Sequence, residues 1–182
     1  MSDSWRNAVQ DAVYGTRPKH INILQRDRLG WVDAARKRTL APPVDEEYTV
    51  VLDYASNNAA LSTNTQMLVL QTPSSPDPYA GTFYTVEARQ RADTYEGALA
   101  GTAVIIHLVG TAYRFAAESQ DVDMPPATVS NNEGSMFKVG EGWTSPDQLF
   151  HVFVESQTAS GFVVKVRRPA VVTGGQQQPR RR

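Results

Sequence analysis

The stretch from Phe150 to Val166 reads FHVFVESQTASGFVVKV and contains two segments in which Phe or Val occupies every second position. In the first segment these positions start at Phe150, and in the second they are Phe162, Val164 and Val166. Side chains two residues apart lie on one face of a strand, so each segment predicts a strand with one buried face. The linker QTASG between them is short and polar, and the pair is therefore predicted to form a β-hairpin.

The same period of two recurs from Arg36 onward, in short segments rich in β-branched and aromatic residues that Pro, Gly, Asn and Ser clusters separate. These segments predict a mainly β fold, an antiparallel β-sandwich of about nine short strands with one or two short N-terminal helices. The predicted strands are 37–40, 47–52, 66–71, 82–89, 103–109, 112–116, 135–139, 149–156 and 161–167.

Two short helical segments are predicted before the β region. In the first, over 5–14, apolar residues recur at spacings of three and four between Ser4 as N-cap and Gly15 as stop. The second is a short helix or turn that runs from Ile21 to Gly30. The predicted organisation is a helical lead-in over 1–30, a β-sandwich domain over 31–168 and a disordered tail over 169–182, whose last ten residues contain no apolar side chain.

Composition excludes several classes of protein. The chain has no cysteine, so disulfide frameworks, thiolate metal sites and cysteine nucleophiles are excluded. With 18 basic and 19 acidic residues the net charge is -1, and no nucleic-acid binding is expected from the folded body. The longest apolar run, 98–109, is shorter than a membrane span requires, and the first residues lack a signal-peptide pattern.

One strand carries a candidate polar cluster. On the predicted strand 82–89, Glu87 and Arg89 lie on the same face, and His107 lies on a strand further along the chain. In a functional interpretation Glu87 is a general base or ligand group whose pKa Arg89 lowers. In a structural interpretation the two residues form an ion pair within the sheet that also meets His107.

Motifs for metal and nucleophilic chemistry are sparse. The three histidines lie in different segments, and the chain has neither a His-Glu-x-x-His nor a Gly-x-Ser-x-Gly motif. Asp121 and Asp123 gather carboxylates in a predicted loop, where they are calcium-ligand candidates or simply a solvated acidic segment. No cofactor is therefore expected, with calcium at Asp121 and Asp123 as the one alternative.

Several segments, taken in order, resemble a known family. These are DRLGWV from Asp27, FYTVEAR from Phe83, YEGALAGTAVIIH from Tyr95 and FKVGEGW from Phe137, followed by the hairpin that starts at Phe150. Together they resemble the β-rich region that follows the catalytic module in secreted zinc metallopeptidases of the gametolysin-like and immune-inhibitor-A-like kinds. The resemblance spans about 21–168. It implies a β domain and an extracellular location, although this chain shows no signal peptide.

The departure from the family matters for function. Zinc peptidases need two histidines and a glutamate on one helix to bind the metal and activate water, and this chain has no such helix. The resemblance therefore implies no catalytic residue: Gly30 and Trp31 would mark the start of the β domain, and Glu87, Arg89 and His107 would be its internal polar cluster.

Three functions remain open from the sequence. The first is a non-catalytic accessory or binding domain with a protein or glycan partner. The second is a structural or assembly protein, such as a capsid or coat subunit, with a basic disordered tail that ends in three arginines. The third is a small hydrolase that uses Glu87, Arg89 and His107 in a loop-lined cleft. The absence of a catalytic motif favours the first.

Overall fold

The structure is a computed structural model that describes residues 8–17, 19–58, 60, 62–71, 81–110, 117–120 and 133–170. The predicted strand over 112–116, the calcium candidates Asp121 and Asp123, and all but the first two residues of the predicted tail lie outside the described residues.

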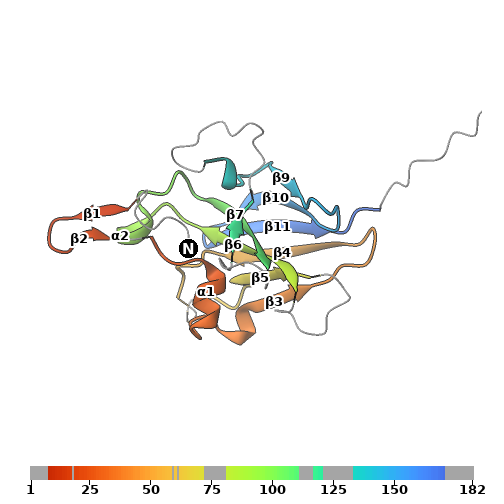
Figure 1. The fold of residues 1–182 in the computed structure, drawn as a ribbon, viewed down its shortest axis with the longest axis horizontal. Coiled ribbons are helices and arrows are strands. Elements are labelled where there is room, and N and C mark those ends of the chain that lie inside the picture. Colours follow the sequence, from red (N-terminus) through yellow and green to blue (C-terminus); the bar gives the residue numbers. More distant parts are fainter. Residues whose placement is uncertain are drawn as a thin grey trace, which may run out of the picture.

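Two sheets packed face to face make up the body of the protein (Figure 1). One sheet has four antiparallel strands in the order β4-β11-β10-β9, and the other has five in the order β3-β5-β6-β7-β8. The described helical segments are α1 (Ile23–Arg28), α2 (Asp93–Glu96) and the 3₁₀ turns Ala34–Arg36 and Glu133–Ser135. The strands are β1 (Val9–Asp11), β2 (Gly15–Arg17), β3 (Lys37–Leu40), β4 (Glu47–Asp53), β5 (Met67–Leu70), β6 (Thr82–Arg89), β7 (Ala103–Gly110), β8 (Glu118–Ser119), β9 (Gly142–Thr144), β10 (His151–Gln157) and β11 (Gly161–Arg167).

The predicted mainly β fold is confirmed, with one parallel pair among the antiparallel ones. β3 and β5 run parallel in the five-stranded sheet, in register from Lys37 opposite Met67. The chain leaves this sheet after β3, contributes β4 to the other sheet and then returns as β5, so the two strands enter the sheet in the same direction. All other named strand pairs are antiparallel, including the predicted hairpin of β10 and β11.

The main core lies between the two sheets. Alternate residues of β10 and β11, such as Val152 and Val164, face the inner residues of β6, such as Val86. At one end, Tyr84 meets the rings of Trp143 and Phe150 edge to face, at centroid distances of 4.9 and 6.0 Å. The period-two pattern thus places one face of each strand in a shared interior.

A second, smaller core covers the outer face of the five-stranded sheet. Ile23 and Leu24 of α1 pack there against Met67, Val69 and Phe83. Because β5 is covered on both faces, all four of its residues are buried. The helix ends in a Schellman motif, in which the Trp31 N–H reaches the Arg26 carbonyl and Gly30 takes a φ of 73°.

Two secondary-structure predictions are wrong. Instead of a helix over 5–14, the described residues Val9–Arg17 form the β1–β2 hairpin. The Asp11 carboxylate accepts the N–H groups of Val13 and Tyr14, and Gly15 takes a φ of 71°, so the local turn outcompetes the helix. Instead of a strand over 135–139, only Phe137 pairs, in an isolated bridge to Val104.

Candidate functional site

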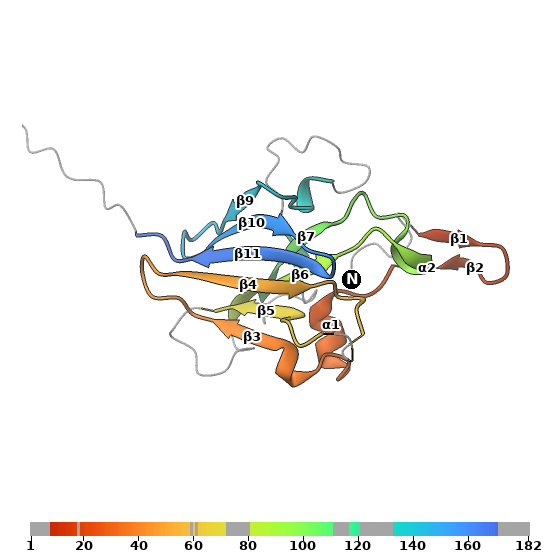
Figure 2. The ribbon, with the colours of Figure 1, turned by 180° about the vertical axis from the view of Figure 1, so that it is seen from behind.

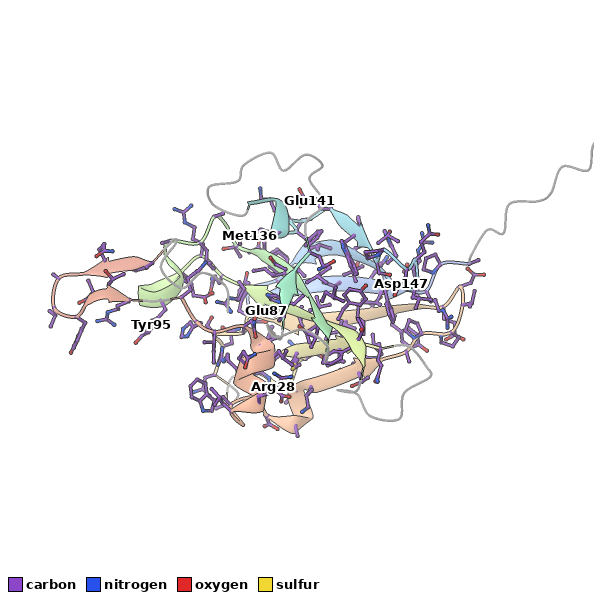
Figure 3. The ribbon with its side chains drawn as sticks, in the orientation of Figure 1. Arg28, Glu87, Tyr95, Met136, Glu141 and Asp147 are labelled. Carbon is purple, nitrogen blue, oxygen red and sulfur yellow. The ribbon has the colours of Figure 1, made fainter. Side chains whose placement is uncertain are left out.

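The sheet brings the three predicted cluster residues together. β6 and β7 pair so that Thr85 lies opposite His107 and Glu87 lies opposite Ile105. The Oε1 of Glu87 is 3.8 Å from the Nδ1 of His107, and its Oε2 is 3.3 Å from the Nη1 of Arg89. Figure 3 labels Glu87 next to the start of α1.

A fourth residue, Glu96 of α2, completes the cluster. Arg89 binds the Glu96 carboxylate through two contacts. The Nη2 of Arg89 is 2.5 Å from the Oε1 of Glu96, and its Nε is 3.0 Å from the Oε2. The sequence does not predict this partner, because a lone glutamate in a predicted loop carries no periodic signal. We use the name anchor cluster for Glu87, Arg89, Glu96 and His107.

The anchor cluster also binds the backbone of the N-terminal segment. Arg89 donates to the carbonyl oxygens of His20 at 2.7 Å and Ile21 at 3.2 Å. Glu87 accepts the N–H of Ile23, the first residue of α1, at 3.0 Å. A carboxylate at a helix N-terminus satisfies a donor that has no intrahelical partner. The cluster therefore fastens residues 20–23 to the face of the sheet.

The cluster is deeply buried. The exposed fractions are 1% for Glu87, 5% for Arg89, 1% for Glu96 and 7% for His107. Burial by itself would lower the pKa of Arg89, but the charges and hydrogen bonds of Glu87 and Glu96 raise it. Burial lowers the pKa of His107, and although Glu87 opposes this, the charge of Arg89 adds to it. His107 is therefore neutral near pH 7.

A second buried ion pair lies at the end of β4, where the sequence analysis named no candidate. The Oδ2 of Asp53 is 2.7 Å from the Nη2 of Arg36, and its Oδ1 accepts from Ser160 at 2.7 Å and Asn64 at 3.1 Å. Burial opposes ionisation of Asp53, but hydrogen bonds from its neighbours, such as Ser160, and the Arg36 charge hold its pKa below the usual value. The ion pair ties β4 to the 3₁₀ turn before β3, and the hydrogen bond from Ser160 ties β4 to the β10–β11 turn.

The rings of the other two histidines contact neighbours outside the anchor cluster. The ring of His20 stacks at a tilt on Tyr95, with centroids 4.8 Å apart. His151 lies on β10, where its Nδ1 is 2.9 Å from the Thr144 hydroxyl and burial lowers its pKa. Within the described residues, no three His, Asp or Glu side chains are grouped so that they could hold a metal ion.

The described residues also include a surface hollow of about 410 Å³, lined by Tyr14, Arg17 and Tyr95. It lies where the β1–β2 hairpin meets α2. In the described part of the chain, no helix is long and apolar enough to cross a bilayer. Comparisons with protein-family models, with curated proteins and with solved structures found no match to this chain.

Proposed function

We propose that this chain is a non-catalytic β-sandwich accessory domain with a binding role, of the kind that follows the catalytic module in secreted metallopeptidases. The observation that supports the proposal most is that the charged groups of the anchor cluster contact other groups of the same protein. Both carboxylates and the guanidinium meet groups of the protein itself, at 1–5% exposure.

A catalytic role would place other demands on these residues. A general base must lie within hydrogen-bond reach of a substrate proton, and an acid or base is usually found in a cleft. Here Glu87 holds Ile23 and Arg89, while Arg89 holds Glu96 and two backbone carbonyls. A substrate that used Glu87 would first have to displace residues 20–23 from the sheet.

The proposal is tested by activity and metal content together. The purified full chain is assayed with fluorogenic peptide, ester and glycoside substrates, and its bound metals are measured by mass spectrometry. We expect no turnover, no stoichiometric zinc and a melting temperature that a chelator leaves unchanged.

Variants decide between a structural and a catalytic cluster. E87Q should lower the melting temperature, whereas E155Q, a change to an exposed glutamate of β10, should have little effect. Turnover that E87Q abolishes and E155Q preserves would contradict the proposal, as would one zinc ion per chain.

A further inference from the structure

The β1–β2 hairpin stands out from the sandwich, and its base adjoins α2 (Figures 1 and 2). Tyr14 is the last residue of the turn at its tip and is 75% exposed, and Tyr95 of α2 is 40% exposed. Together with Arg17 of β2, these two rings line the surface hollow of about 410 Å³. This volume lies in the range of small-molecule sites in proteins.

Polar contacts hold the three lining residues in place. Asp11 accepts the N–H groups of Val13 and Tyr14 through Oδ1 and contacts the Nη2 of Arg17 through Oδ2 at 2.8 Å. The guanidinium carbon of Arg17 is 4.6 Å from the ring centre of Tyr14 and 5.6 Å from that of Tyr95. These are cation–π distances, so the rings and the cation position one another.

The anchor cluster supports the other side of the hollow. Glu96, which forms an ion pair with Arg89, follows Tyr95 directly in α2. The backbone of His20 also accepts from Arg89, and its ring contacts Tyr95. The buried charges thus fix the position of α2, which carries Tyr95, and of residues 20–21, which follow the hairpin that carries Tyr14 and Arg17. The hollow is organised before any ligand arrives.

Charge and polarity restrict the ligand. Among the described residues that line the hollow, Arg17 is the one cation, and its pairing with Asp11 leaves no net positive charge on them for a phosphate or another dianion. Arg17 offers hydrogen-bond donors to the hollow, and the tyrosines offer apolar ring faces that carry hydroxyl groups.

We propose that this hollow binds a neutral saccharide unit. A pyranose ring has one face of C–H groups that packs on an aromatic ring and an edge of hydroxyls that exchange hydrogen bonds with Arg and Tyr side chains, the residue types that line the hollow. A protein partner is less well matched, because a stable protein interface buries about 1,200–2,000 Å², whereas the large exposed apolar side chains that the structure describes in this region are Val13 and Tyr14 at the tip and Tyr95 on α2. The inference deepens the binding role in the proposed function and rests on it.

The test is saturation-transfer NMR on the full chain with glucose, galactose, mannose and N-acetylglucosamine as probes. We expect transfer to the C–H protons of at least one of these sugars. Y14A and Y95A should abolish it, and V13A is the matched control, because Val13 is 80% exposed beside Tyr14 but does not line the hollow. V13A should leave the signal unchanged.

Three results would overturn the inference. The first is no transfer to any of the four sugars, the second is transfer that survives in Y14A, and the third is binding of glucuronate that exceeds binding of glucose and weakens with salt. Circular dichroism of Y14A confirms that the variant is folded. Failure of sugar binding leaves the non-catalytic assignment standing, whereas turnover or stoichiometric zinc refutes that assignment whatever the sugar result.

Discussion

Replacing Arg89 by alanine should destabilise the protein strongly. The substitution leaves the carboxylates of Glu87 and Glu96 buried without their shared cation, and it removes the donors to the His20 and Ile21 carbonyls. Removing one partner of a buried ion pair costs about 3–5 kcal/mol of unfolding free energy. For a chain of this size that cost corresponds to a melting temperature lowered by roughly 6–20 °C.

Urea denaturation followed by tryptophan fluorescence measures this cost, because Trp143 lies buried in the main core. K165A is the control, since Lys165 contacts Glu155 at 2.7 Å on the solvent-exposed side of β11. An exposed pair of this kind contributes about 0–1 kcal/mol. If R89A is too unstable to purify, R89K keeps the charge but loses the bidentate fork and should give an intermediate loss.

A double-mutant cycle isolates the contact with Glu96. The combined R89A/E96A variant should lose less stability than the sum of the single losses, by about 0.5–3 kcal/mol, because the second change removes the stranded carboxylate. A loss below about 1 kcal/mol in R89A, or strict additivity in the cycle, would refute the view that these charges are buried and mutually dependent.

Three further predictions follow from buried groups. The pKa of His107 is lower in the folded state than its unfolded value near 6.5, so the unfolded chain binds the proton more readily. The stability is therefore full above about pH 6.5 and falls as the pH drops below it. Thermal melts from pH 7 to pH 5 should show a smaller loss of stability in H107Q than in the wild type. D53A should cost about 3–5 kcal/mol in chemical denaturation, because it leaves Arg36 buried without its partner. G161A should be destabilised by more than about 1–3 kcal/mol, because a Cβ at position 161 overlaps the Leu52 carbonyl oxygen. At Gly101 a Cβ meets no neighbour, so the melting temperature of G101A should barely differ from that of the wild type.

Local patterns predicted the strands well. The β10–β11 hairpin follows from alternation at Phe162, Val164 and Val166, because one face of each strand is buried against a partner sheet. β6 keeps its predicted bounds for the same reason. Where a strand is covered on both faces, as in β5, every residue is buried and the period of two does not describe the burial.

The wrong and missing predictions arise from side-chain interactions that hydrophobic periodicity does not reveal. The N-terminal helix fails because the Asp11 side chain captures two backbone N–H groups and Gly15 permits the turn. Glu96 and Asp53 join ion pairs with Arg89 and Arg36 through tertiary folding, and neither carboxylate belongs to a recognisable motif. The grouping of Glu87, Arg89 and His107 could be predicted because strand pairing alone brings them together.

The most direct test of the account is amide hydrogen exchange in the wild type and in E96Q. The anchor cluster fastens residues 20–23 and α1 to the sheet. Neutralising one of its carboxylates should therefore release residues 20–23 and α1 before the rest of the fold. We predict faster exchange in peptides that cover 19–28, with β10 and β11 unchanged. Equal exchange over 19–28 in both proteins would contradict the account, because the buried charges would then not hold the segment in place.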